Sequence, residues 1–167
     1  MHDEAIGLQS HDPAWKLRFE AEASLLERVI GPWVFGGPHH VGSTAVPELE
    51  AKPIIDILVG VRSLDEARAC FEPLADLSYL YAPYRSEEMH WFCKPIPSRR
   101  THHLHLVPVA SQRYRDELTF RDRLRADPEV AEEYARLKRK LAERYRHDRE
   151  AYTDGKSDFI RRVVSPE

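Results

Sequence analysis

The spacing of apolar residues predicts a helix at the start of the chain. Over residues 13–30, Trp15, Phe19, Leu26 and Ile30 fall on one face of a helical turn pattern, with polar residues between them. An aspartate followed by proline precedes this stretch, as at many helix starts, and a Gly-Pro pair follows it. The pattern therefore predicts an amphipathic helix.

Short apolar runs rich in β-branched and aromatic residues follow, and they predict strands. These runs cover residues 33–42, 53–60, 78–84, 89–96 and 101–109. Between the second and third runs, Ser63 and Glu66 fit a capping box, which predicts a helix to about Ala75. Prolines and basic residues at 95–100 indicate a hairpin connection or an exposed loop.

The last third of the chain is rich in charge and has helical periodicity. Helices are predicted over residues 111–125, 128–147 and 149–164, with Asp127-Pro128 marking the first break. The order of elements predicts an α+β or α/β fold, in which a mixed β-sheet packs with helices and the C-terminal third is helical. The length predicts one domain over residues 1–167.

Composition excludes several classes of protein. The chain is 42% hydrophobic and 32% charged, and its net charge of −3 gives no support for binding bulk nucleic acid. No apolar run is long enough to cross a membrane, and the first residues do not resemble a signal peptide. Two cysteines are too few for a disulfide framework or a cysteine-based zinc site. We expect a cytoplasmic protein.

Asp56 is the first residue that needs an explanation, because it lies inside the apolar run of residues 54–59. A buried carboxylate is costly unless it is paired, hydrogen-bonded or bound to a metal ion. It is either tied to backbone amides or an arginine, or it is a ligand for Mg²⁺, which binds through carboxylates and substrate phosphates.

A Gly-Ser-Thr turn and a lysine precede this strand in the sequence. The backbone amides of residues 42–44 (Gly-Ser-Thr) can form a nest for phosphate oxygens, although such a triplet is also an ordinary turn. Lys52 precedes Pro53 at the start of the strand, where it would meet an anionic ligand or simply remain solvated. Neither feature alone identifies a site.

Two histidines form a second candidate group. If residues 101–109 form a strand, His103 and His105 lie on the same face about 7 Å apart, while His102 faces the other side. Such a pair can bind a metal ion, exchange protons, bind phosphate or serve only as a polar pair at a sheet edge. Zn²⁺ bound by these histidines and Asp56 is one option.

Three basic residues of the C-terminal helices stand next to aromatic residues. They are Arg121 beside Phe120, Lys138 four residues after Tyr134, and Lys156 four residues after Tyr152. In a helix, an aromatic residue and a lysine four positions later share a face, so the ring packs and the ammonium group extends outward. Solvation at the surface explains most basic residues of this region.

Taken together, these segments resemble the GrpB-like family, which is placed in the nucleotidyltransferase superfamily with the polymerase β-type fold. The similar segments are residues 40–47 (HVGSTAVP), 52–57 (KPIIDI), 103–107 (HLHLV), 120–125, 133–138 and 152–156. The resemblance covers the chain from about Trp15 to Ile160.

The resemblance implies a role for each conspicuous residue. In the superfamily, a Gly-Ser turn holds a nucleoside triphosphate, and two carboxylates two residues apart on the next strand hold Mg²⁺. Here the turn corresponds to residues 42–43 and one carboxylate to Asp56, but the second position is Ile54 or Leu58. The position on the neighbouring strand corresponds to His103 or His105.

The resemblance leads us to expect an enzyme that transfers a nucleotidyl group from a nucleoside triphosphate to a small acceptor. The expected catalytic residues are Asp56, His103 and His105. A divalent ion, Mg²⁺ or Mn²⁺ or alternatively Zn²⁺, is expected at Asp56 and His105. The residues expected to bind the nucleotide phosphates are Gly42, Ser43, Thr44, Lys52, Arg121, Lys138 and Lys156.

Because one carboxylate is missing, a second hypothesis is a catalytically inert module that binds a nucleotide or phosphorylated metabolite. A third is a metal-dependent hydrolase built on Asp56, His103 and His105. Under each hypothesis we expect a monomer or homodimer with no membrane partner.

Overall fold

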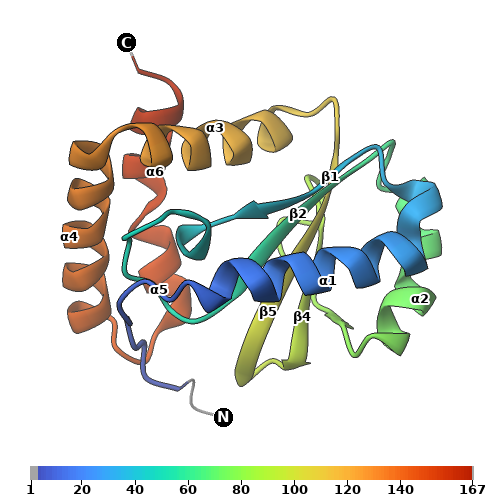
Figure 1. Ribbon diagram of the computed structural model, residues 1–167, viewed down its shortest axis with the longest axis horizontal. Coiled ribbons are helices and arrows are strands. Elements are labelled where there is room, and N and C mark those ends of the chain that lie inside the picture. The colour runs from blue at the N-terminus through green and yellow to red at the C-terminus, as the bar shows by residue number, and fades with distance from the viewer. Residues whose placement is uncertain (1–3, 167) are drawn as a thin grey trace.

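The computed structural model describes residues 4–166 and contains a five-stranded mixed sheet (Figure 1). The strands are β1 (Gly36–Val41), β2 (Ile55–Val61), β3 (Leu80–Tyr81), β4 (His90–Ile96) and β5 (Arg99–Pro108), in the order β1-β2-β5-β4-β3. Strand β2 pairs parallel with β5, and all other neighbours are antiparallel. The predicted α+β fold with a mixed sheet is confirmed.

Six α-helices surround the sheet. They are α1 (Ala14–Ile30), α2 (Phe71–Asp76), α3 (Gln112–Ala126), α4 (Pro128–Arg144), α5 (Arg149–Asp154) and α6 (Ser157–Val164), with single 3₁₀ turns η1 (Gly31–Trp33), η2 (Ser43–Ala45) and η3 (Glu66–Cys70). Figure 1 shows α1 lying along the sheet, and α4 to α6 standing together at one end of it. None of the helices in residues 4–166 is long and apolar enough to cross a membrane.

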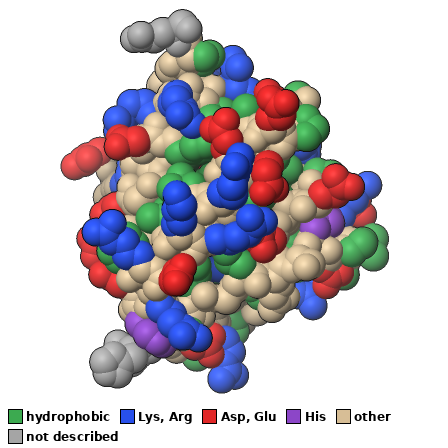
Figure 2. Space-filling model, turned by 90° about the vertical axis from the view of Figure 1, so that its left-hand side faces the viewer, with side chains coloured by type: hydrophobic (Ala, Val, Ile, Leu, Met, Phe, Trp, Pro, Cys, Tyr) green, Lys and Arg blue, Asp and Glu red, His purple; other side chains and the backbone are tan. Residues whose placement is uncertain are grey.

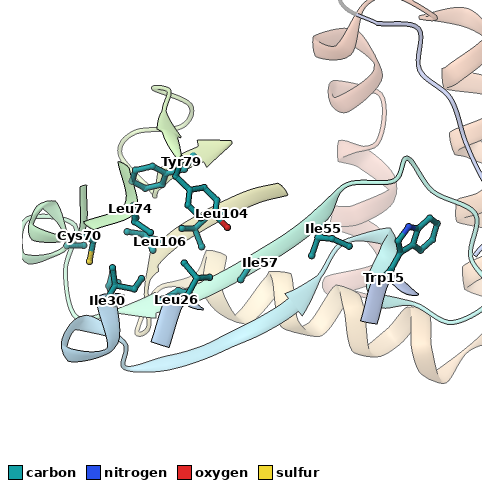
Figure 3. Packing of buried hydrophobic residues seen from close by; sticks show 14 of the residues in the cluster. Trp15, Leu26, Ile30, Ile55, Ile57, Cys70, Leu74, Tyr79, Leu104 and Leu106 are labelled. Carbon is teal, nitrogen blue, oxygen red and sulfur yellow. The ribbon is translucent and has the colours of Figure 1, made fainter. Parts of the chain in front are cut away.

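The two-residue period of β2 and β5 sends alternate side chains to opposite faces of the sheet. Ile55 and Ile57 of β2 point to the same side as Leu104 and Leu106 of β5, and these residues pack with Leu26 of α1 in the main core (Figure 3). All five are at most 1% exposed. Helices α1 and α2 cover this face, which also carries His102, whose Nε2 lies 3.9 Å from the carboxylate of Glu22.

The opposite face carries Asp56 of β2 and His103 and His105 of β5. Next to Asp56 on this face, Leu58 packs with Val107 and with Tyr114 of α3 in a second cluster. Gly60 leaves room for the Tyr114 ring, because a Cβ there would lie 2.8 Å from the ring atom Cε2. Helix α3 therefore covers one end of this face, and the other end is left to Asp56 and the histidines.

Three predicted elements differ in extent from the observed ones. The predicted helix to Ala75 is a 3₁₀ turn followed by the short α2, because Pro73 has no N–H and fits only the first turn of a helix. The strand predicted at 78–84 pairs only at Leu80 and Tyr81, since Ser78 has a positive φ and Pro83 cannot donate.

The last helix is also shorter than predicted. It divides at Gly155 into α5 and α6, and α6 begins at Ser157. Leu141 of α4 fills the space beside Gly155, where a Cβ would lie 2.5 Å from its Cδ2. The break after α3 is confirmed, because the Asp127 carboxylate accepts hydrogen bonds from the first N–H groups of α4.

Candidate functional site

The site begins where β1 ends and the chain turns beneath Asp56. Gly42 has φ 74° and ψ −176°, a conformation that is essentially restricted to glycine. Its Cα lies so close to Asp56 that a Cβ would be 2.4 Å from the carboxylate atom Oδ2. Glycine at this position therefore permits both the turn into η2 and the contact of the turn with Asp56.

Replacing Gly42 by alanine is expected to damage both features. The backbone strain should cost about 1–3 kcal/mol of unfolding free energy, and the added methyl group should displace the Asp56 carboxylate. Chemical denaturation measures the first effect. Gly7 is the matched control, because a Cβ added there would meet no heavy atom within 4 Å, and Gly7→Ala should leave stability unchanged. Equal stability of the two variants would contradict the tight contact.

Asp56 and His103 form a hydrogen-bonded pair across neighbouring strands. They are direct partners in the β2–β5 register, and His103 Nδ1 lies 2.9 Å from Asp56 Oδ1. Burial alone would raise the pKa of Asp56, but the hydrogen bond and charge of His103 hold it at about 2. The Asp56 side chain is 26% exposed. It is therefore an ionised carboxylate that a ligand can reach.

The protonation of His103 follows from its neighbour. Burial lowers the pKa of His103 more than the hydrogen bond to Asp56 raises it, so the ring is neutral at pH 7. A carboxylate can only accept, so the proton lies on Nδ1 and Nε2 keeps a lone pair. Within the described chain, that buried Nε2 has no hydrogen-bond partner.

His105 belongs to a different pair. Its Nδ1 lies 3.1 Å and 3.2 Å from the two carboxylate oxygens of Glu117 on α3, and Arg113 Nε lies 3.1 Å from the same carboxylate. Although burial opposes it, the charge of Glu117 raises the pKa of His105. Glu117 is a residue of the site that the sequence did not indicate. Its spacing of four residues from Arg113 resembles an ordinary helical ion pair, so nothing marked it.

These pairings bear on the expected divalent ion. Asp56 is hydrogen-bonded to His103, and His105 is hydrogen-bonded to Glu117. Residues 4–166 contain no group of three histidine, cysteine or acidic side chains at metal-binding spacing. A Mg²⁺ ion held by one carboxylate would therefore take its other ligands from substrate phosphates and water. The ion expected at Asp56 and His105 stays a prediction.

Three lysines, Lys52, Lys138 and Lys156, form a cluster that reaches the Gly-Ser-Thr turn through Lys138. Lys138 of α4 donates to Ser43 Oγ at 2.9 Å and to the Glu50 carbonyl oxygen. Lys52 and Lys156 place their ammonium groups 4.8 Å and 4.6 Å from the centre of the Tyr152 ring. The structure thus brings Lys138 into contact with Ser43 and places Lys52 and Lys156 close enough to Lys138 to lower its pKa.

The lysine cluster carries more positive charge than its own carboxylates compensate. Burial and then repulsion by Lys156 lower the pKa of both Lys52 and Lys138 to about 7. The Glu50 carboxylate raises the pKa of Lys138, but the Arg139 guanidinium already pairs with it. An anion bound among these lysines would relieve their mutual repulsion.

Two predicted phosphate ligands, Thr44 and Arg121, make their side-chain contacts outside the lysine cluster. The Thr44 hydroxyl is buried and hydrogen-bonded to His40 Nε2 and to the Ile54 carbonyl, so only its backbone can meet a ligand. Arg121 donates to the His40 carbonyl oxygen and pairs with Asp122, on the β1 side of the turn. Arg121 and Thr44 remain predicted ligands.

A groove of about 880 Å³ lies elsewhere, on the outer side of α4 and α6. Glu133, Arg136, Leu137, Arg139, Lys140, Gly155, Asp158, Phe159 and Arg162 line it. Figure 2 shows lysine and arginine side chains interspersed with acidic ones on this side of the molecule. None of the ten predicted site residues lines the groove, so its shape gives no information about the chemistry at Asp56.

Comparison with known proteins gives one consistent match. The family model described as GrpB protein matches residues 5–165. A UPF0157 protein of Pseudomonas aeruginosa is 41% identical over 97% of this chain and 67% of its own length. The glutamate-rich protein GrpB of Alkalihalophilus pseudofirmus is 38% identical over 95% of this chain and 93% of its own length.

A solved structure is similar to this chain in both fold and sequence. The crystal structure of conserved protein GrpB from Enterococcus faecalis has a TM-score of 0.85 and 31% identity, covering 95% of this chain and 94% of that one.

Proposed function

Since the chain belongs to the GrpB protein family, we propose that it binds a nucleoside triphosphate and transfers a nucleotidyl group to a small acceptor. The lysine cluster at Ser43 is the observation that carries this proposal. Burial first, and repulsion by Lys156 second, lower the pKa of Lys52 and of Lys138 to about 7 in the free protein. Buried cations of one sign call for an anionic ligand of high charge, and a triphosphate supplies it.

The triphosphate would lie against the turn between β1 and η2. Ser43 and the backbone amides of residues 42–44 supply hydrogen-bond donors, and the lysines supply positive charge. Nucleotidyl transfer depends mainly on positioning and on neutralising charge in the transition state. A divalent ion arriving with the nucleotide would add neutralising charge there, and the Asp56 carboxylate lies directly against the turn.

His103 is the proposed general base for the acceptor. The Asp56 carboxylate accepts the hydrogen bond from Nδ1–H of His103. This fixes the proton on Nδ1 and leaves the lone pair of Nε2 to accept a proton from the acceptor. Nε2 lacks a partner in the free protein, and an acceptor hydroxyl or amine would provide one. An acceptor must displace the side chains that cover Nε2, which keep solvent away from it until then.

Thermal unfolding against the four nucleoside triphosphates tests the binding step. Each nucleotide is supplied with Mg²⁺, Mn²⁺, Zn²⁺ or a chelator. A ligand at about 100 times its dissociation constant should add about 2.7 kcal/mol to stability. A shift that needs both nucleotide and metal supports the transferase, whereas no shift with any nucleotide would overturn the proposal.

Asp56→Asn tests the transfer step once a nucleotide is identified. The amide keeps the shape of the side chain but removes the charge that orients His103, so turnover should fall about 100-fold or more. Pyrophosphate release measures it. Asp76→Asn is the matched control, because Asp76 is exposed at the end of α2 and is not among the predicted site residues. Full activity of Asp56→Asn would exclude this role.

A second candidate function is an inert sensor of nucleotides or phosphorylated metabolites. It is favoured by the pairing of both carboxylates on this face, Asp56 with His103 and Glu117 with His105 and Arg113. A sensor would show the thermal shift without any release of pyrophosphate. Release of pyrophosphate in the presence of nucleotide and candidate acceptors would rule the sensor out.

A further inference from the structure

The hydrogen bond between Ser43 and Lys138 joins a half-buried hydroxyl to a fully buried amine. The distance from Lys138 Nζ to Ser43 Oγ is 2.9 Å, and Lys138 is 1% exposed while Ser43 is partly open to solvent. A reactive hydroxyl on the open side and a base on the closed side is the arrangement that activates a serine nucleophile. Serine–lysine pairs of this kind are known on several unrelated folds.

A third group fixes the amine, as activation requires. Lys138 Nζ donates to the Glu50 carbonyl oxygen, which can only accept. The amine also lies 5.1 Å from the centre of the Tyr134 ring, on its own helix. One N–H is therefore committed to Glu50, and a neutral Lys138 can turn its lone pair to the Ser43 hydroxyl.

The protonation state of Lys138 allows this role near neutral pH. Burial first, and repulsion by Lys156 second, lower the pKa of Lys138 to about 7. A lysine with an ordinary pKa near 10 would be charged and could not accept a proton. The lowered pKa supports the geometry, which stands on the contacts with Ser43 and Glu50.

We propose that Ser43 and Lys138 form a nucleophile and general-base pair that cleaves the ester bond of a small anionic substrate. The Ser43 proton moves to Lys138 Nζ while Oγ bonds to the carbonyl carbon. The ester C–O bond then breaks, and the leaving alkoxide takes the proton from Lys138. Water attacks the resulting acyl-serine, gives a proton to Lys138, and releases the acid and free Ser43 as the proton returns to Oγ.

Lys52 and Lys156 define the charge of that substrate. Both ammonium groups contact the Tyr152 ring, and both lie close enough to Lys138 to lower its pKa. A carboxylate or phosphate on the substrate would bind between them, whereas a cationic ester would be repelled. This activity goes beyond nucleotidyl transfer and does not require it, although the two substrates would compete for the same lysines.

A rhodamine-linked fluorophosphonate, which reacts with activated serines, tests the nucleophile. The folded protein should be labelled once, at Ser43 by peptide mass spectrometry, and pyrophosphate should slow the labelling. Ser43→Ala should remove the label. Ser24→Ala, at a serine of α1 outside the lysine cluster, is the control and should leave labelling unchanged. Absence of label on folded wild type between pH 6 and 9 would overturn the proposal.

Hydrolysis of nitrophenyl esters tests the base and the charge preference. The anionic mono-4-nitrophenyl succinate should be cleaved at least tenfold faster than 4-nitrophenyl acetate, with a rate that rises as pH passes through about 7. Lys138→Met, checked for folding by circular dichroism, should lose at least tenfold in labelling and hydrolysis. Unchanged rates in this variant would overturn the base role. Nucleotide-induced thermal shifts without labelling would refute this inference and leave the nucleotide site standing.

Discussion

Replacing Lys138 by methionine is expected to weaken pyrophosphate binding by about 100-fold, equivalent to about 2.7 kcal/mol, without unfolding the protein. Lys138 is the cation in direct contact with Ser43, so its loss removes both a charge and a donor from the turn. Methionine has a similar length and suits a buried position. Removing a desolvated cation that is repelled by Lys52 and Lys156 offsets the lost hydrogen bonds to Ser43 and Glu50.

Isothermal titration with pyrophosphate and thermal unfolding measure the two halves of this prediction. Lys140→Met, at an exposed lysine of the same helix, should bind pyrophosphate as wild type does. Unchanged affinity in Lys138→Met would contradict the anion site. A fall of more than about 2 kcal/mol in unfolding free energy would show that relief of repulsion does not offset the lost hydrogen bonds.

The pH dependence of stability gives an independent readout for the same variant. The folded protein releases the Lys138 proton near pH 7, whereas the unfolded chain keeps it to about pH 10. The unfolded state therefore binds more protons between these values, so wild-type stability should rise with pH across this window. Lys138→Met lacks this contribution and should show a smaller rise.

Replacing Glu22 by alanine is expected to lower the unfolding free energy by about 3–5 kcal/mol, the usual cost of breaking a buried ion pair. Glu22 of α1 is 5% exposed and faces the sheet. Its carboxylate lies 2.5 Å from Lys94 Nζ and accepts a hydrogen bond from the Tyr79 hydroxyl, with 2.8 Å between the oxygens. Without it, the Lys94 ammonium stays largely buried beside the Tyr79 ring and has lost its carboxylate partner.

Urea unfolding measures this loss, and two variants define its cause. Glu27→Ala, at an exposed glutamate of the same helix, should change stability by less than about 0.5 kcal/mol. Glu22→Gln keeps an acceptor for Tyr79 but not the charge, so its loss should be intermediate. A loss below about 1 kcal/mol in Glu22→Ala would show that Lys94 finds other solvation.

Part of the candidate site could be predicted because the signal lies in neighbouring residues. Asp56 stands out against the apolar residues on either side of it. The alternation of His103 and His105 with leucines predicts that both histidines share one face of the strand, and in the structure they contact Asp56 and Glu117. A strand repeats every two residues, so the face of a side chain follows from its position in the run.

Other contacts of the structure could not be predicted, because no pattern in the neighbouring residues indicates them. Ser43 and Lys138 are 95 residues apart, and Glu22 and Lys94 are 72 apart. On α1, Glu22 has the same helical spacing from its neighbours as any solvated charge, and Glu117 resembles half of a surface ion pair. Only the packing of α1, α3 and α4 around the sheet determines which of their charges are buried and which groups they meet.

The sequence by itself determined the α+β class, the order of most elements, and the side of the sheet that carries the polar residues. These properties depend on helix and strand periods and on caps, which act over a few residues. The tertiary structure alone decided that Asp56 is hydrogen-bonded to His103, that His105 is held by Glu117, and that Lys138 contacts Ser43 with Lys52 and Lys156 near it. Contacts of this kind arise from strand register and helix docking, which join residues that carry no mark of each other in the sequence.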